Sequence, residues 1–298
     1  MKCLVTGGAG FIGSHIVDRL INDGHEVLVI DNESADAHDS FYYNSKAIYH
    51  KLNIKDYGDI EPLFNGVSYV FHLAAESRIQ PTIEKPIEAC MVNFIGTTNV
   101  LEASRVNNVK RVMYSSTSAA YGLNNKPPLK ESMVRDCLNP YSVSKVGGED
   151  LCKMYYTLYG LETIVFRYFN VYGERQPLKG QYAPVIGLFM RQKINNTPMT
   201  IVGDGLQKRD FTNVEDVVEA NILASTCENP LALGQVMNIG TGTNCTILDL
   251  VGYIGGEYKF IPDRPAESRV SLADASKAKS LLGWEAKKTL IQYIKENQ

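Results

Sequence analysis

Short apolar segments alternate with amphipathic segments over the first 167 residues of the chain. Strands are predicted from the apolar segments at residues 2–6, 26–31, 47–54, 69–73, 111–116 and 163–167. Helices are predicted near residues 56–64, 86–107 and 141–159, and a first helix presents Ile12, Ile16, Val17, Leu20 and Ile21 on one face. Because strands and helices alternate, we predict a doubly wound α/β fold, with helices on both faces of five or six parallel strands.

This regular alternation weakens after Arg167. Helices are expected near residues 184–195 and 214–228 and twice more within 246–282, with loops at 173–181 and 261–265. We therefore divide the chain into a sheet domain at residues 1–167 and a smaller, loop-rich α/β lobe at residues 168–298. No Ser/Gly-rich linker separates these parts, so we expect them to fold against each other, with the chain crossing between them more than once.

Composition and charge exclude several classes of protein. The 298 residues hold 30 Lys and Arg against 33 Asp and Glu, so no overall positive field favours nucleic acid. No apolar run reaches the length of about 18 residues that a membrane span needs, and residues 3–5 are too short for a signal-peptide core. We expect a cytoplasmic protein without membrane partners. Because the six cysteines and five histidines are scattered, we predict neither disulfides nor a metal site.

A glycine-rich loop joins the first strand to the first helix. Gly7 and Gly10 allow a tight turn and the close approach of a pyrophosphate to backbone N–H groups, and Gly13 allows the helix to pack close to the strand. Asp31 ends the second strand, 18 residues after Gly13. A carboxylate at this place accepts hydrogen bonds from the ribose hydroxyls and repels a 2′-phosphate, which favours NAD over NADP. The alternative is that Asp31 is a solvated turn residue.

Small and apolar residues follow the next two predicted strands of the sheet. Asn53 and Ile54 end the third strand, and Leu73, Ala74 and Ala75 end the fourth. The carboxyl edge of a parallel sheet is where a dinucleotide lies, and such residues suit an adenine slot. Taken alone, the same residues would indicate only a hydrophobic core.

The candidate chemistry lies on one predicted helix and the strand before it. Tyr141 and Lys145 are four residues apart, which places the phenol and the ammonium on one helical face. A free tyrosine has a pKa near 10, so a nearby cation is needed to favour the phenolate at neutral pH. Thr117 follows a buried strand and supplies a hydroxyl that can share a proton with Tyr141. We predict these three residues to be catalytic.

Together the motifs resemble the NAD-dependent epimerase/dehydratase family of extended short-chain dehydrogenases/reductases, and most of all its nucleotide-sugar 4-epimerases. The matching segments are 6–13, 31–32, 72–75, 92–97, 115–122, 141–145, 167–173, 209–211 and 264–265. The resemblance implies a Rossmann fold, bound NAD and a UDP-sugar that is transiently oxidised at carbon 4. In that scheme Tyr141 removes the proton of the 4-hydroxyl, Thr117 assists, and Lys145 holds the nicotinamide ribose.

The resemblance also implies further binding residues in both parts of the chain. To the cofactor site it adds Phe11, Ile12, Asn32, Asn93, Ser115 and Phe169. To the substrate site it assigns Ser77, Thr117, Asn170, Tyr182, Val185, Arg209, Arg264, Glu267 and Ser271. Arg209 and Arg264 suit the diphosphate because guanidinium forks match phosphate oxygens, although ordinary surface ion pairs are the alternative.

The same comparison bears on the reaction and the sugar. Thr117 is followed by Ser118 and Ala119, whereas the family's dehydratases and decarboxylases carry carboxyl side chains there. Ser271 matches the position that limits sugar size, and its small side chain predicts that UDP-N-acetylglucosamine and UDP-N-acetylgalactosamine are accepted, alongside the glucose/galactose pair. The alternatives are another nucleotide-sugar dehydratase or reductase, and a non-catalytic dinucleotide sensor.

The resemblance implies a homodimer as well. Its interface would be a bundle formed by the predicted helices at 86–107 and 141–159. The seam would hold Met91, Phe94, Val100, Leu151, Met154 and Tyr155, although these residues can also face the sheet.

Overall fold

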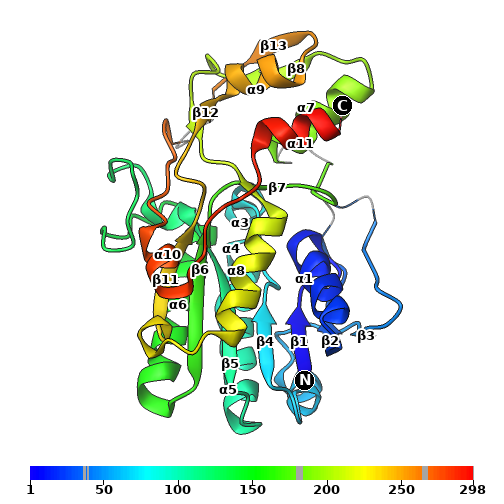
Figure 1. Cartoon of the computed structure of the whole chain (residues 1–298), viewed down its shortest axis with the longest axis vertical. Coiled ribbons are helices and arrows are strands. Elements are labelled where there is room, and N and C mark those ends of the chain that lie inside the picture. The colour runs from blue at the N-terminus through cyan, green and yellow to red at the C-terminus, as the bar shows by residue number, and fades with distance from the viewer. Residues whose placement is uncertain (36–37, 39, 179–183, 264–267, 298) are drawn as a thin grey trace.

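The computed structural model describes residues 1–35, 38, 40–178, 184–263 and 268–297. Its centre is a sheet of seven parallel strands in the order β11-β6-β5-β4-β1-β2-β3 (Figure 1). The strands are β1 Lys2–Thr6, β2 Glu26–Ile30, β3 Ile48–His50, β4 Tyr69–His72, β5 Arg111–Thr117, β6 Glu162–Tyr168 and β11 Gln235–Ile239. The predicted doubly wound α/β fold is therefore confirmed, with one or two more strands than expected.

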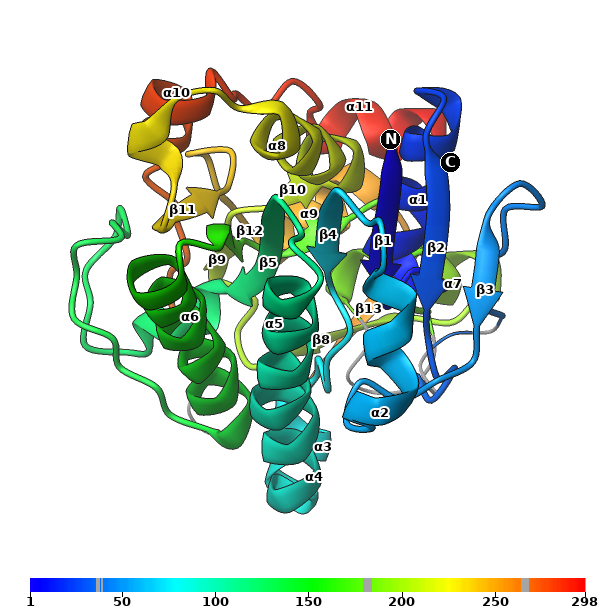
Figure 2. The ribbon, with the colours of Figure 1, turned by 90° about the horizontal axis from the view of Figure 1, so that it is seen from below.

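Helices cover both faces of this sheet (Figure 2). One face carries α1 Phe11–Asn22, α8 Val214–Thr226 and α10 Ser276–Leu282. The other face carries α2 Tyr57–Ile60, the short 3₁₀ helix Glu61–Phe64, α5 Thr97–Val106 and α6 Pro140–Tyr159. Additional helical segments are α3 Ile79–Glu84, α4 Pro86–Cys90, and the 3₁₀ turns Ser118–Tyr121 and Pro230–Ala232.

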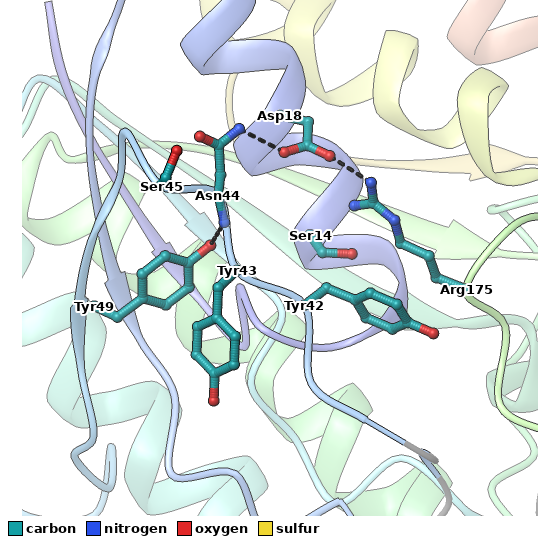
Figure 3. A pocket seen from close by; sticks show the side chains of 8 residues that line it. All are labelled: Ser14, Asp18, Tyr42, Tyr43, Asn44, Ser45, Tyr49 and Arg175. Carbon is teal, nitrogen blue, oxygen red and sulfur yellow. Dashed lines mark hydrogen bonds and ion pairs between the residues drawn. The ribbon is translucent and has the colours of Figure 1, made fainter.

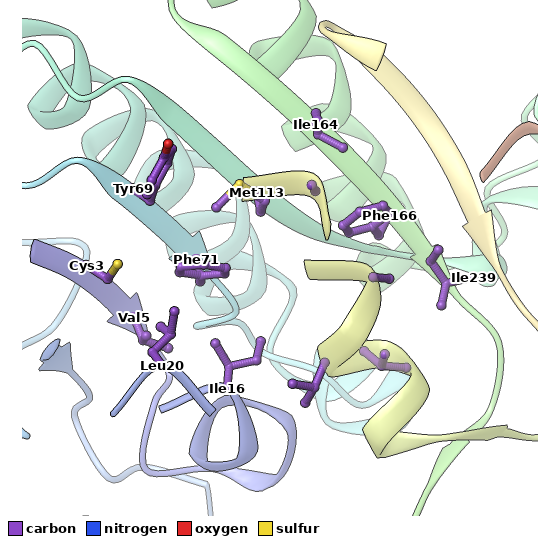
Figure 4. Packing of buried hydrophobic residues seen from close by; sticks show 14 of the residues in the cluster. Cys3, Val5, Ile16, Leu20, Tyr69, Phe71, Met113, Ile164, Phe166 and Ile239 are labelled. Carbon is purple, nitrogen blue, oxygen red and sulfur yellow. The ribbon is translucent and has the colours of Figure 1, made fainter. Parts of the chain in front are cut away.

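Alternation along each strand divides the core into two layers. Cys3 and Val5 of β1 point to the layer under α1 and α8, where they meet Ile16 and Leu20 (Figure 4). Leu4, which lies between them in the sequence, joins the opposite layer under α5 and α6. Both layers are fully buried at these positions, which explains why the strand sequences read as continuous apolar runs.

Two predicted elements differ from the structure. The strand predicted at 47–54 is shortened to β3, because it lies at the sheet edge and pairs only with β2. The helix predicted at 86–107 consists of α4, a π-helical turn at Met91–Gly96, and α5. Such turns occur frequently at functional sites, and this one contains the buried Asn93.

The seventh strand, β11, and the helix α8 both come from beyond residue 167 and complete the sheet and its cover. The rest of the second part forms a separate core around α7 Val185–Ile194, β8 Met199–Val202, α9 Ile247–Ile254 and α11 Leu290–Glu296. The largely exposed strand β13 Tyr258–Ile261 pairs with β8. Two further short strand pairs lie outside the seven-stranded sheet: β7 Val171–Tyr172 with β10 Thr212–Asn213, and β9 Lys208–Arg209 with β12 Cys245–Thr246. The division at residue 167 stays a prediction.

Within the part of the chain that the structure describes, none of the helices combines the length and the apolar character that crossing a membrane requires.

Candidate active site

The glycine-rich loop leaves the end of β1 and turns into α1. Gly7 has a φ of 70°, and a Cβ at this position would lie 2.8 Å from the amide nitrogen of Ala74, at the end of β4. A Cβ at Gly13 would overlap the carbonyl oxygen of Gly7. Among the described residues, a Cβ at Gly10 would meet only that carbonyl oxygen, at 3.4 Å, and His38, at 3.8 Å. Gly7 and Gly13 therefore allow close contacts within the protein, whereas more space surrounds the backbone at Gly10.

Asp31 lies beside this loop, directly after β2. Its carboxylate accepts hydrogen bonds from the backbone N–H of Ala9 at 3.0 Å and of Glu33 at 2.8 Å. Burial raises the pKa of the half-buried carboxyl group, and the two N–H donors oppose that shift. Asn32 instead closes a turn, because its side-chain oxygen accepts hydrogen bonds from the amide and the hydroxyl of Ser34.

A chain of hydrogen bonds connects the end of β1 to the π-helical turn. The Thr6 hydroxyl oxygen accepts from the amides of Leu73 and Ala74, and the Thr6 side chain contacts His72 Nδ1 at 2.7 Å. His72 Nε2 lies 2.9 Å from the hydroxyl of Thr97, which itself donates to a backbone carbonyl. This arrangement fits a neutral imidazole protonated on Nε2, and burial lowers the pKa of His72 to about 3.

Asn93 is fully buried in the π-helical turn and joins two other segments. Its side-chain oxygen accepts from the Glu76 amide at 2.8 Å, and its nitrogen donates to the Glu76 carbonyl and to the hydroxyl of Ser144, both at 3.0 Å. All of its side-chain atoms with hydrogen-bonding capacity are thus engaged inside the protein. Asn93, predicted as a cofactor residue, positions the loop after β4 against the start of α6.

Tyr141 and Lys145 share one face of α6, as predicted. The helix begins where the Asn139 side chain accepts from the Ser142 amide, with Pro140 at the first helical position. Tyr141 therefore lies in the first turn, close to the carboxyl edge of the sheet. The Thr117 hydroxyl, at the end of β5, is near enough to the Tyr141 phenol to lower its pKa, and the structure thus brings together the three residues predicted to be catalytic.

The two titratable groups of this centre are shifted in opposite directions. Burial raises the pKa of Tyr141, and the hydrogen bond with Thr117 opposes that shift. Lys145 is only 2% exposed, and burial lowers the pKa of its ammonium to about 7, against an opposing contribution from Glu149. The Lys145 ammonium lies 4.3 Å from the centre of the Tyr114 ring, a cation–π contact that offsets part of the desolvation.

The remaining predicted cofactor residues lie at several depths. Phe11 and Ile12 open α1, Ala75 follows β4 and Asn53 follows β3, all partly exposed. Ile54, Ser115 and Phe169 are buried. The Ser115 hydroxyl is bonded to the Tyr168 hydroxyl at 3.1 Å, and the Phe169 ring packs with Tyr121.

Three predicted substrate residues come together in the second part of the chain. Asn170 donates to the carbonyl of Asp210 at 2.8 Å, and Arg209 precedes this aspartate on β9. The amide of Ser271 donates to the carbonyl of Lys208 at 3.0 Å, so Ser271 lies next to β9. Val185 opens α7, and Ser77 is exposed after β4. Tyr182, Arg264 and Glu267 lie outside the described residues.

Asp210 organises this region, although the sequence patterns predict no chemistry for it. Its buried carboxylate accepts hydrogen bonds from the amide and hydroxyl of Thr241 and from the amides of Gly242 and Ala273, at 2.8–3.0 Å. Burial raises the pKa of this carboxyl group, and the four donors oppose the shift. The Arg-Asp-Phe segment at 209–211 was the available signal, but its partners lie up to 63 residues away.

A cavity of about 320 Å³ lies beside α1 (Figure 3). Arg175 crosses from the second part of the chain to pair with Asp18 at 2.7 Å, and its guanidinium stacks on the Tyr42 ring. Asn44 donates to the other oxygen of Asp18. None of the predicted cofactor and substrate residues that the structure describes lines this cavity, and residues 42–45 of the loop after β2 form part of its wall. Among the described residues, no three His, Cys, Asp or Glu gather as a metal site.

Comparison with known proteins extends over nearly the whole chain. A sequence model of the family described as GDP-mannose 4,6 dehydratase matches residues 4–297. A putative UDP-glucose 4-epimerase of Methanocaldococcus jannaschii is 39% identical, covering 98% of this chain and 95% of the relative. A UDP-N-acetyl-alpha-D-glucosaminuronate decarboxylase of Bacillus cytotoxicus is 38% identical over 80% of this chain and 75% of its own length.

Solved structures agree with these relatives. The UDP-glucose 4-epimerase of Thermotoga maritima, determined with UDP-glucose, superposes with a TM-score of 0.93 at 37% identity, over 99% of this chain and 96% of that one. The UDP-glucose 4-epimerase of Thermus thermophilus, in complex with NAD, superposes with a TM-score of 0.89 at 30% identity, over the same shares. The prediction of NAD as the family's cofactor is thereby confirmed. This chain belongs to the GDP-mannose 4,6 dehydratase family, which is the NAD-dependent epimerase/dehydratase family that its motifs resemble.

Proposed function

We propose that this protein is an NAD-dependent 4-epimerase of a UDP-hexose, and that it accepts UDP-N-acetylglucosamine and UDP-N-acetylgalactosamine. The observation that carries the proposal is the placement of Tyr141 beside the Thr117 hydroxyl, one helical turn from the buried Lys145. This centre lies at the same sheet edge as the glycine-rich loop, because Thr6 and Thr117 both end parallel strands of one sheet.

The residues present fit a dinucleotide. The open space at Gly10, at the N-terminus of α1, leaves room for a diphosphate against backbone N–H groups, where the helix dipole favours negative charge. The Asp31 carboxylate lies beside this loop, where it can accept hydrogen bonds from the ribose hydroxyls. When bound, oxidised NAD supplies a hydride acceptor and a positive charge, and it is regenerated within each catalytic cycle.

The chain's own residues perform the proton transfers. The Tyr141 phenolate oxygen takes the proton of the sugar 4-hydroxyl and returns it later, and the Thr117 hydroxyl shares that proton. Burial alone raises the pKa of Tyr141, so the phenolate depends on positive charge nearby. Lys145 supplies one such charge and binds the nicotinamide ribose, and its position over Tyr114 fixes its ammonium.

Epimerisation is favoured over the other reactions of this family by the two residues after Thr117. Ser118 and Ala119 begin a 3₁₀ turn, and neither carries the carboxyl group that elimination or decarboxylation would use. The decarboxylase among the relatives makes this the alternative to exclude.

The sugar specificity rests on Ser271. Its backbone is bonded to Lys208, the neighbour of the predicted diphosphate ligand Arg209, so Ser271 lies beside the strand that holds that ligand. A small side chain there leaves volume for an N-acetyl group at carbon 2 of the sugar. A Ser271→Tyr variant should lose the N-acetylated pair and keep the glucose pair.

The test combines cofactor identification with product analysis. Purified protein is denatured to identify any released nucleotide, and is then incubated with UDP-glucose, UDP-N-acetylglucosamine and UDP-glucuronate under proton NMR. Epimerisation conserves mass, dehydration releases water and decarboxylation releases carbon dioxide. Turnover of UDP-glucose with none of UDP-N-acetylglucosamine, unchanged in Ser271→Tyr, would overturn the specificity proposal.

A Tyr141→Phe variant separates catalysis from cofactor binding. General acid–base groups contribute about 10²–10⁴-fold to rate, so turnover should fall by that order while NAD stays bound. Unchanged biological activity in this variant would favour the dinucleotide sensor instead.

The proposed assembly is a homodimer. Met91 and Phe94 of the π-helical turn and Val143 of α6 are substantially exposed apolar side chains. Val100 and Tyr155, which the predicted seam also includes, are instead buried against the sheet. Light scattering of the purified protein tests this arrangement.

A further inference from the structure

A second cavity, of about 460 Å³, lies at the outer edge of the sheet beside β11. Its walls come from that strand at residues 234–236, from α6, from the first turn of α10 and from the loop at residues 130–132. Figures 1 and 2 both place β11, α6 and α10 at this edge. Within the described part of the chain, no residue predicted to bind cofactor or substrate lines the cavity.

Four cations line this cavity against one carboxylate. The cations are Lys130, Lys153, Arg167 and Lys277, and the carboxylate is Glu131. Lys130 pairs with Asp274 at 3.5 Å, and Arg167 pairs with a glutamate of α6. For Lys153 and Lys277, the described residues show no ion pair.

Lys277 and Glu131 are each constrained by their surroundings. Burial lowers the pKa of the half-buried Lys277, Glu131 opposes this shift, and the positive charge of Arg167 adds to it. The Glu131 carboxylate also accepts a hydrogen bond from the backbone N–H of Asn238, on β11, at 2.7 Å. A further anion would relieve the repulsion between Lys277 and Arg167.

Arg167 supplies an independent observation. Its side chain is 3% exposed, and two of its nitrogens are bound to Glu149 at 2.8 and 2.6 Å. The third, Nη1, is buried without a hydrogen-bond partner among the described residues. A buried N–H group of a charged side chain normally has a partner, because leaving it unpaired is costly.

We propose that this cavity binds a phosphate group, either free or carried by a small metabolite. Lysine ammonium groups and the remaining N–H donors of Arg167 Nη1 are charged donors that suit phosphate oxygens. The volume lies in the range of small-molecule sites and exceeds what inorganic phosphate alone needs. The site stands apart from the proposed active site, so it does not depend on the proposed reaction.

The proposed phosphate site borders α6, the helix that carries Tyr141 and Lys145. Glu149, the partner of Arg167, also accepts the Ser116 hydroxyl at 2.5 Å, and Ser116 precedes the catalytic Thr117. Lys153 lies one turn further along α6 than Glu149. A phosphate at this site therefore contacts the elements that hold the catalytic residues, without touching those residues.

Isothermal titration calorimetry tests the proposal with inorganic phosphate and with sn-glycerol 3-phosphate, at low ionic strength and with UDP in excess to occupy the proposed active site. The double variant Lys153→Ala/Lys277→Ala should bind both ligands at least about tenfold more weakly. The matched control is Lys279→Ala, which removes the same charge from α10 outside the cavity, where Lys279 pairs with Glu285.

The two ligands distinguish the sources of the phosphate. Tighter binding of the organic phosphate indicates a metabolite, and equal binding indicates free phosphate. The proposal is overturned if the wild type shows no saturable binding, or if the control variant weakens binding as much as the double variant does. Thermal melts of the three proteins show whether each is folded, so that a loss of binding is read only from folded protein.

Discussion

Glu149 and Arg167 form a two-pronged ion pair inside the protein, with Nε to Oε1 at 2.8 Å and Nη2 to Oε2 at 2.6 Å. Each side chain is 3% exposed. The pair joins α6 to β6, and the Ser116 hydroxyl brings in β5. Through these contacts the helix that carries Tyr141 is held in register with the strand that carries Thr117.

Removing one partner of this pair should destabilise the protein strongly. Glu149→Gln leaves the Arg167 charge buried and uncompensated, which typically costs about 3–5 kcal/mol of unfolding free energy. Urea denaturation measures this loss of unfolding free energy. The control is Asp204→Asn, in the exposed two-pronged pair with Arg269, where only a small loss of stability is expected because solvent screens exposed charges. Equal losses in both variants would contradict the role given to burial.

His72 should make the protein sensitive to acid. The pKa of the imidazole is near 6.5 in the unfolded chain and about 3 in the folded chain, where burial favours the neutral form. As the pH falls from 6.5 to 3, the unfolded chain binds a proton that the folded chain excludes, so stability is lost by up to about 1.4 kcal/mol per pH unit. In a His72→Asn variant, this contribution to the pH dependence of stability should be absent. Parallel stability curves for the two proteins between pH 7 and 4 would refute the prediction.

Lys145 should reduce stability near neutral pH. Its pKa falls from 10.5 to about 7 on folding, so between these values the unfolded chain holds a proton that the folded chain releases. The contribution of Lys145 to stability therefore rises with pH from 7 to 10.5. Nucleotide-free Lys145→Met should be more stable than the wild type at pH 7, by a margin that shrinks by about 1.4 kcal/mol per pH unit as the pH rises. Denaturation at several pH values measures the margin, and a constant difference would count against a buried ammonium.

Asp31 should control the affinity for NAD. An Asp31→Ala variant removes the acceptor of the ribose hydroxyls together with the anchor of the Ala9 and Glu33 amides. Charge-assisted hydrogen bonds contribute about 1.5–3 kcal/mol, so NAD should bind at least about tenfold more weakly, with a smaller loss for NADP. Titration with both nucleotides measures this, and Asp23→Ala, at the exposed end of α1, is the control. Unchanged NAD affinity would support the solvated-turn interpretation.

Local patterns were sufficient for much of the fold. The strands β1, β4, β5 and β6 were predicted within two residues at each end, because buried parallel strands are continuous apolar runs. Strand β11 was missed because it lies among loops and its pairing with β6 joins residues about 70 positions apart. The π-helical turn was predicted as uninterrupted helix, and the contacts that its Asn93 makes with Glu76 and Ser144 join residues 17 and 51 positions apart.

The candidate site likewise has features that short segments determine and features that depend on distant contacts. The spacing of Tyr141 and Lys145 and the positions of Gly7 and Gly13 are properties of short segments, and the sequence by itself determined them. Only the tertiary structure decided the pKa of Lys145, which depends on the groups that bury its ammonium.

The buried connections of Thr6 with His72 and of Glu149 with Arg167 were likewise decided by the tertiary structure. The physical reason is that desolvation and hydrogen-bond pairing are set by groups brought together from distant parts of the chain. Helical and strand periodicity, in contrast, is set by each residue's immediate neighbours.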